Sequence, residues 1–220
     1  MSSINRATLS KSLSVSLAVG AYGTAFGAAA VAAGFSVLQA CLLSLLTFTG
    51  ASQFAVIGVL GAGGGALSGV ATASLLGLRN SIYSMIAKPI IKVSGFKKLI
   101  ATQITIDESI AVSLAEEVRG SDAMRHGFWL TGGGVFLFWN LFTLLGALGA
   151  QAIGDPAAWG LDAAVPAAFL GLVWPRLKSQ RDYLLAISAV ALALLLTPLV
   201  SAGLPIIATA LLAILFARFR

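Results

Sequence analysis

Charged residues are scarce in this chain of 220 residues, because Lys, Arg, Asp and Glu together make up only 10% of it. A soluble domain carries roughly 25% of these residues, so this chain has too few of them to cover a water-facing surface. Hydrophobic residues make up 58% and the mean hydropathy is +0.96, which is typical of a protein that faces lipid. The composition therefore predicts an integral membrane protein.

Cysteine and histidine are almost absent, with one residue of each, Cys41 and His126. A single cysteine excludes a disulfide framework within the chain. One Cys and one His also leave no ligand spacing for a zinc site. The sequence has no G-x-S-x-G elbow and no phosphate-binding loop. We therefore expect no catalytic residues, no metal and no cofactor, and we do not predict an enzyme.

The net charge of +6 would suggest nucleic-acid binding in a soluble protein. Here, however, the cations lie at the ends of apolar runs, which is the distribution of the positive-inside rule. We therefore expect the lipid bilayer, and no nucleic acid, as the environment of this chain.

Long apolar runs stand where charge is missing. They are continuous, which favours helices over a β-barrel, whose strands alternate in polarity. We predict an all-α polytopic membrane protein with a single transmembrane transporter domain over residues 1–220. About six runs are expected to cross the membrane completely: 13–33, 64–87, 126–153, 160–175, 182–200 and 204–218.

Residues 36–62 do not fit one upright crossing, because a helix of that length would be about 40 Å long. If this segment crossed once, the lysines at 88, 92, 97 and 98 would fall outside, against the positive-inside rule. A broken or re-entrant helical hairpin that turns at Thr49–Gly50–Ala51 places them in the cytoplasm instead. The alternative is a continuous tilted helix with Ser and Thr side chains bonded to its own carbonyls.

A second short hairpin at 99–118, which returns to its own side, keeps Arg119 and Arg125 cytoplasmic as well. The resulting topology puts both termini on the cytoplasmic side of the inner (cytoplasmic) membrane. Pro89 is expected to end the span before it.

Polar side chains at membrane depth are costly and indicate functional sites. Arg79 lies on a polar stripe of its predicted helix, and its alternative role is to reach the cytoplasmic interface as an anchor. Asp107 is either a counter-charge or proton acceptor, or the cap of a helix that starts at Glu108. Gln53 and Asn140 bind a solute or hold two helices together. The candidate substrate-binding residues are Thr49, Gly50, Ser52, Gln53, Arg79, Asn80, Tyr83 and Asn140, and the candidate proton-coupling residues are Asp107 and Glu108.

Four segments, in the same order, resemble the AzlC family of branched-chain amino acid permeases. They are FTGASQFAVIGVLGAGG, LLGLRNSIYSM, TIDESIAVSLAEE and GLDAAVPAAFLGLVWP, and they extend from about residue 50 to 175. The resemblance implies an exporter of branched-chain or similar hydrophobic amino acids. It also implies a small hydrophobic partner subunit of the AzlD type.

An amino acid zwitterion needs one site for an anion and one for a cation. A helix that restarts at Ala51 or Ser52 would hold the carboxylate with its free N–H groups, together with Arg79. Asp107, or carbonyls at the break, would hold the ammonium group, and proton-coupled secondary transport follows as a hypothesis. The alternatives are export of another small amphipathic metabolite, or a channel-like or scaffold subunit that transports nothing.

Overall fold

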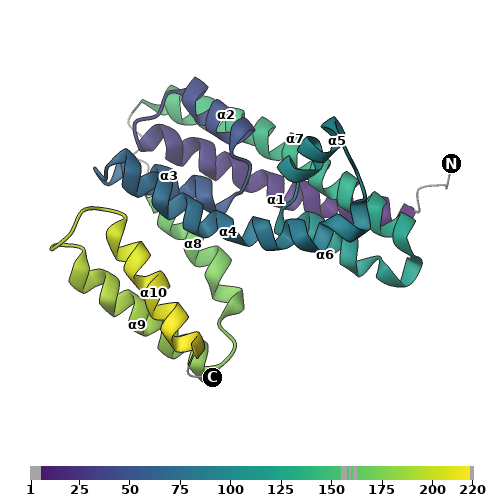
Figure 1. Cartoon of the computed structure of the whole chain (residues 1–220). Coiled ribbons are helices and arrows are strands. Elements are labelled where there is room, and N and C mark those ends of the chain that lie inside the picture. Colours follow the sequence, from purple (N-terminus) through teal and green to yellow (C-terminus); the bar gives the residue numbers. More distant parts are fainter. Residues whose placement is uncertain (1–5, 155–157, 159, 161–162, 219–220) are drawn as a thin grey trace.

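The computed structural model describes residues 6–154, 158, 160 and 163–218 (Figure 1). All regular structure in these residues is helical, which confirms the predicted all-α fold. The helices are α1 (Arg6–Ala32), α2 (Val37–Leu46), α3 (Ala51–Gly61), α4 (Ala66–Ile91), α5 (Phe96–Gln103), α6 (Asp107–Ala115), α7 (Ser121–Ile153), α8 (Ala164–Val173), α9 (Gln180–Leu196) and α10 (Leu204–Arg218), with short 3-10 helices η1 (Glu117–Arg119) and η4 (Trp174–Arg176).

Two of the described helices, α1 and α7, are long and apolar enough to cross a membrane by length and composition. The other predicted spans do not meet this test, so the expected count of six full crossings is not confirmed. Helix α4 has 26 residues but contains Arg79, Asn80 and Lys88, and α9 has 17 residues. Helix α8 has only 10 residues, and the predicted span 160–175 extends partly outside the described residues.

Helices α1 and α7 pack side by side through glycine. A Cβ atom on Gly23 or Gly27 would collide with the backbone oxygen of Trp139 or Thr143, respectively. Small residues four apart let two helix backbones approach this closely, and backbone contact replaces the hydrophobic driving force that is missing in lipid. The α1–α7 pair therefore forms the rigid centre of the molecule.

The predicted hairpin at 36–62 is present as two short helices, α2 and α3, with a break between Leu46 and Ala51. A continuous helix through this segment is therefore wrong. Ser36 begins α2 with a capping box, in which its hydroxyl accepts from the N–H of Gln39 and its own N–H donates to the Gln39 side chain. The break thus separates two helices of 10 and 11 residues, each too short to cross alone.

The segment 99–118 is broken in the same way, into α5 and α6, with Ile104–Ile106 between them. The chain therefore follows one pattern twice, in which a long helix is followed by two short ones. In Figure 1 the pairs α2–α3 and α5–α6 approach the middle of the molecule from opposite ends.

Contacts between side chains and backbone define these two ends. At one end Glu116, after α6, accepts from Lys11 of α1 and from Arg119, at 2.7 and 2.8 Å. At the same end the side chain of Arg125 donates to the carbonyl of Ile90 near the end of α4, at 2.9 Å. Cations of α1, η1 and α7 therefore gather at one end of the bundle, beside the end of α4.

The outer surface is apolar, unlike that of a soluble domain. Many leucines of the outer surface are exposed, including Leu67 and Leu38, at 84% and 68%. Buried residues, in contrast, include hydroxyls along the inner face of α1 and α7 such as Ser12 and Thr131, which bond each other at 3.0 Å. An apolar exterior around a polar seam suits a lipid environment.

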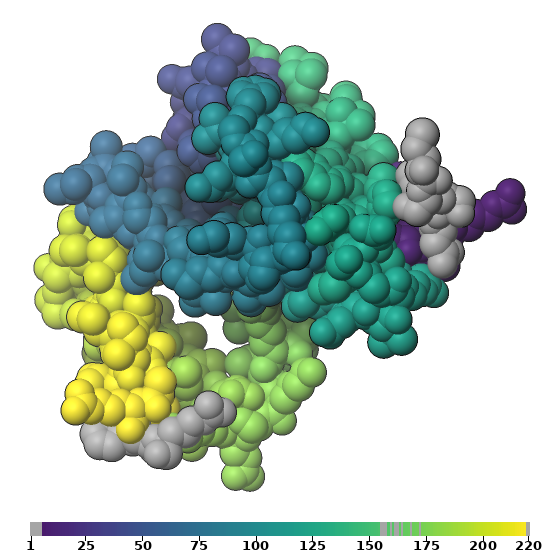
Figure 2. All heavy atoms as spheres, turned by 45° about the vertical axis from the view of Figure 1, so that its right-hand side comes forward, coloured from purple at the N-terminus to yellow at the C-terminus, as the bar shows by residue number. Residues whose placement is uncertain are grey.

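The C-terminal helices α9 and α10 form an antiparallel pair that stands apart from the rest (Figures 1 and 2). Helix α4 differs from the prediction at its end, because it continues through Pro89 to Ile91. A proline inside a helix removes one backbone hydrogen bond and crowds the carbonyl four residues earlier, and packing of Ile91 and Ala87 in a buried cluster with Phe128 offsets this cost in the last turn.

Candidate functional site

A cavity of about 130 Å³ lies where the two helix breaks meet. Both breaks contribute to its walls, as do α1, α4 and α7. Its volume is below that of common drug-sized pockets, so it suits a small solute. The lining residues are Val19, Tyr22, Phe48, Thr49, Gly50, Ala51, Phe54, Arg79, Ile106, Asp107, Glu108, Val135 and Trp139.

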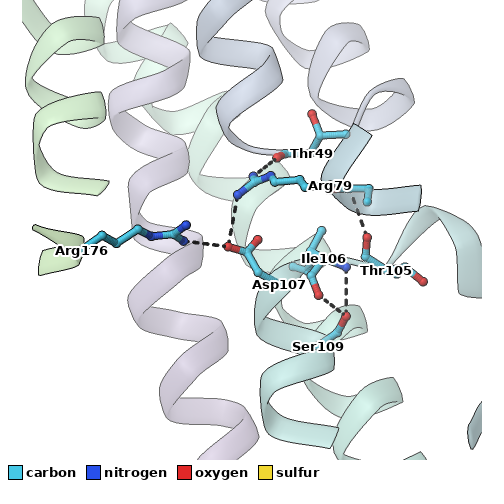
Figure 3. A network of polar contacts seen from close by, with 8 residues as sticks. Thr49, Arg79, Thr105, Ile106, Asp107, Ser109 and Arg176 are labelled. Carbon is cyan, nitrogen blue, oxygen red and sulfur yellow. Dashed lines mark hydrogen bonds and ion pairs between the residues drawn. The ribbon is translucent and has the colours of Figure 1, made fainter. Parts of the chain in front are cut away.

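Arg79 connects the two breaks (Figure 3). One guanidinium nitrogen donates to the carbonyl of Thr49 at 3.0 Å, and another pairs with Asp107 at 3.3 Å. Both side chains of this ion pair are about 30% exposed, at 29% and 30%. The guanidinium therefore lies between the two breaks and contacts both of them.

The first break depends on Gly50. This residue has φ 67°, in the left-handed region that glycine adopts without steric cost. Its N–H donates to the side-chain oxygen of Gln53 at 3.2 Å, while the Gln53 amide nitrogen donates back to the carbonyl of Leu43 at 3.2 Å. Gln53 thereby joins the end of α2 to the start of α3. The N-terminal turn of α3 carries a partial positive charge, and its first residue, Ala51, lines the cavity.

The second break is built in a comparable way. The N–H of Ile106 donates to the hydroxyl of Ser109 at 3.0 Å, and that hydroxyl lies 3.0 Å from the carbonyl of Ile104, to which it donates. Ile106 is the N-cap, and α6 begins at Asp107. The suggested role of Asp107 as cap of a helix that starts at Glu108 is therefore wrong. Its carboxylate instead faces two arginines, because Arg176 also approaches it, at 3.7 Å (Figure 3).

Five of the ten predicted site residues line the cavity. They are Thr49, Gly50, Arg79, Asp107 and Glu108. The structure thus brings together two groups that are far apart in the sequence, the turn of the first hairpin and the carboxylates of the second.

The other five lie outside the cavity walls. Asn80 donates to the carbonyl of Thr105 at 3.3 Å, and Asn140 accepts from Ser44 at 2.7 Å, so both connect neighbouring helices. The remaining three are Ser52, which is buried close to Gly77, Gln53, which joins α2 to α3, and Tyr83, which packs against the buried cluster at the end of α4.

Trp139 and Arg176 were missed by the sequence-based prediction. The Trp139 ring packs against Phe54 and Phe26, and its indole N–H is buried without a hydrogen-bond partner among the described residues. A tryptophan in the middle of a long apolar run, away from the interfacial belts, was the available signal. Arg176 follows an apolar run in the sequence, a position that by itself indicates only a flanking cation.

The arrangement places opposite charges at the two breaks and aromatic or aliphatic side chains between them. Arg79 and the start of α3 favour an anionic group, whereas Asp107 and Glu108 favour a cationic one. Phe54, Trp139 and their neighbours suit an apolar side chain. Such a cavity is complementary to a small solute that carries both charges.

Comparisons with known proteins identify related membrane proteins. The profile of the AzlC protein family matches residues 14–153. An "uncharacterized membrane protein" of Archaeoglobus fulgidus is 38% identical over 195 residues, which cover 84% of this chain and 81% of that protein. No solved structure matches the chain significantly.

Proposed function

Because this chain belongs to the AzlC family of membrane proteins, we propose that it is a secondary transporter that exports branched-chain or similar hydrophobic amino acids. The observation that carries the proposal is the cavity between the two helix breaks. It combines one cation, two carboxylates and apolar walls in a volume of about 130 Å³.

Binding would proceed by exchange of ion pairs. In the structure Arg79 pairs with Asp107 at 3.3 Å. An amino acid that enters between them gives its carboxylate to Arg79 and the N–H groups at Ala51, and its ammonium to Asp107. One ion pair is thereby replaced by two, so neither charge is left unpaired at membrane depth. The aliphatic side chain contacts Phe54 and Trp139.

Coupling to protons is proposed for the neighbouring carboxylates, Asp107 and Glu108. Both line the cavity, and adjacent like charges favour proton uptake by one of them once the solute ammonium has left. Glu108 would take this proton, because Asp107 then pairs with Arg79 again. This step couples solute movement to the proton gradient.

A small hydrophobic subunit of the AzlD type is the proposed partner, in the cytoplasmic membrane, with both termini of this chain on the cytoplasmic side. The helices α9 and α10 support a partner, because large apolar side chains such as Leu194, Leu195 and Leu211 are 59–70% exposed on them. A membrane-facing surface of this kind is covered by lipid or by another transmembrane protein.

Counterflow of labelled leucine and valine in proteoliposomes tests the proposal, with and without a co-expressed AzlD-type subunit. We expect concentrative exchange that Arg79→Gln lowers at least about tenfold. The matched control is Arg181→Gln, because Arg181 also donates to one carbonyl, that of Phe216, outside the cavity. Absence of exchange in every preparation would favour a scaffold subunit. Exchange of other metabolites in preference to leucine and valine would show that the protein is a transporter with a different substrate.

A further inference from the structure

A second cavity, of about 320 Å³, lies at the cationic end of the bundle, away from the site described above. It is formed by the last turns of α4, by one face of α5 and by Phe128 of α7. Three lysines, Lys88, Lys92 and Lys98, line it together with the hydroxyl residues Ser84, Thr102 and Thr105. The floor is apolar, with Ala87, Ile91, Ala101 and Phe128 all buried.

The lysines of this cavity lack anionic partners. Among the described residues, no carboxylate lies within ion-pair distance of Lys88, Lys92 or Lys98. The C-terminal carbonyls of α4 carry only partial negative charge, and one of them, that of Ile90, accepts from Arg125 at 2.9 Å. Three ammonium groups around one hollow repel each other unless an anion is present.

Lys92 is held there at a conformational cost. It is the only non-glycine residue with positive φ in the described chain, at 50°, in the position after α4 where glycine is usual. Unfavourable backbone geometry that persists in a fold indicates a local requirement. At this position it keeps a third lysine beside the hollow.

The surroundings are those of a membrane interface. Phe96 and Leu99 of α5 and Met85 of α4 are apolar side chains that are 75%, 66% and 73% exposed. Phe96 and Leu99 belong to the same short helix as Lys97 and Lys98, which is the composition of an amphipathic segment lying at an anionic lipid surface. In Figure 2, α4 and α5 both lie on the face turned to the viewer.

We propose that this cavity binds a phosphate-bearing anion, and that the headgroup of an anionic phospholipid is its occupant. The three lysines hold the phosphate, and the hydroxyls of Thr102 and Ser84 contact the glycerol part. The acyl chains follow the exposed apolar side chains at Met85 and Phe96. Basic cavities beside transmembrane helices bind anionic headgroups by this combination of charges and apolar contact.

Lipid binding to the full-length purified protein tests the site. Native mass spectrometry and thermal unfolding are measured with phosphatidylglycerol, with phosphatidylcholine and with inorganic phosphate. We expect phosphatidylglycerol to bind and stabilise more than phosphatidylcholine. If inorganic phosphate competes at millimolar concentration, the site takes free phosphate as well; if it does not, the lipid is the specific ligand.

A double variant, Lys88→Gln with Lys98→Gln, is compared with the matched control Lys178→Gln with Arg218→Gln, which removes the same charge outside the cavity and outside α5. We expect about fivefold weaker binding per cavity lysine, and little change in the control. Equal losses in both variants would reduce the effect to general surface charge and overturn the proposal. The proposal would also be overturned if the unmodified protein bound phosphatidylglycerol and phosphatidylcholine equally and inorganic phosphate had no effect.

Discussion

The two helix breaks are closed by the same kind of hydrogen bond but differ in charge. In each, the N–H of the N-cap residue donates to the side chain three positions later, Gln53 after Gly50 and Ser109 after Ile106. The first break exposes a helix start with no charged residue, whereas the second begins with two carboxylates, Asp107 and Glu108. The comparison teaches that the break is a structural device, and that the residues placed on it decide which ligand group it attracts.

The largest expected effect comes from a test of whether the two hairpins enter the membrane from opposite sides. Labelling of a cysteine from one side of the membrane either occurs or does not. In a Cys41→Ala background, Ser94→Cys lies between α4 and α5, and Ala62→Cys lies after α3; both positions are exposed. We expect a membrane-impermeant maleimide to label Ser94→Cys only from the cytoplasmic side and Ala62→Cys only from the outside. Labelling of both from one side would contradict the opposed arrangement.

Removal of the carboxylate from the second break should abolish what distinguishes it from the first. In Asp107→Asn, Arg79 and Arg176 lose their anionic partner. We expect transport to fall by about tenfold or more, while Arg176→Gln, whose contact is longer and more exposed, changes it less. Counterflow of labelled leucine measures both, and comparable losses would assign Arg176 an equal role.

Loss of the Gln53 side chain should destabilise the first break more than loss of the Ser109 side chain destabilises the second. Gln53 is 1% exposed and joins three backbone groups, two of them carbonyls at the end of α2. Gln53→Ala is expected to cost about 1–3 kcal/mol, because buried polar groups are left unpaired. Ser109→Ala should cost less, because one hydroxyl proton is shared between two carbonyls and the carbonyl of Ile106 still accepts from the N–H of Ile110. The midpoints of thermal unfolding in detergent compare the two, and a larger loss for Ser109→Ala would reverse the order.

The conformational requirement at Gly50 has no counterpart at Ile106, whose φ is −130°. A Cβ at Gly50 meets no other atom within 4 Å, so the cost of Gly50→Ala is confined to the backbone. We expect a loss of about 1 kcal/mol in the free energy of unfolding. Ile106→Val, which retains a β-branched side chain in extended backbone, serves as the control, and an unchanged unfolding midpoint for Gly50→Ala would show that the turn relaxes.

Acid should destabilise the second hairpin and leave the first unchanged. Near neutral pH this is the smallest of the expected effects. The Lys11 ammonium, helped by the Thr8 hydroxyl and Arg119, lowers the pKa of Glu116 to about 2 despite its burial, which acts in the opposite direction. A carboxyl group with a lowered pKa stabilises the fold above its unfolded-state pKa of about 4.5, and this contribution is lost as pH falls toward 2.

Hydrogen exchange between pH 6 and pH 3 measures this loss in α6 against α3. We expect protection of α6 to decline first, and Glu116→Gln to remove the pH dependence while lowering protection at pH 6. A decline of equal size in both helices would show general unfolding.

Several features of the fold follow from local residue patterns alone. The apolar runs predict helices, and the polar residues at Thr49–Gly50 predict an interruption where it is observed. The lysines after α4 predict the end of the bundle at which they lie, because flanking charge acts over short distances along the chain. The precise end of α4 was not predictable, since buried packing of Ile91 overrides the effect of Pro89.

The contacts within the candidate site do not follow from local residue patterns. The sequence by itself determined the lipid-facing character, the helix breaks and the charged residues at membrane depth, because each depends on neighbours along the chain. Only the tertiary structure decided that Arg79 faces Asp107, that Gln53 and Asn140 serve helix contacts, and that Trp139 lines the cavity. Those facts depend on how α1 and α7 pack through their glycines and on which helix ends then meet, and long-range contacts of this kind are not encoded in the periodicity of any one segment.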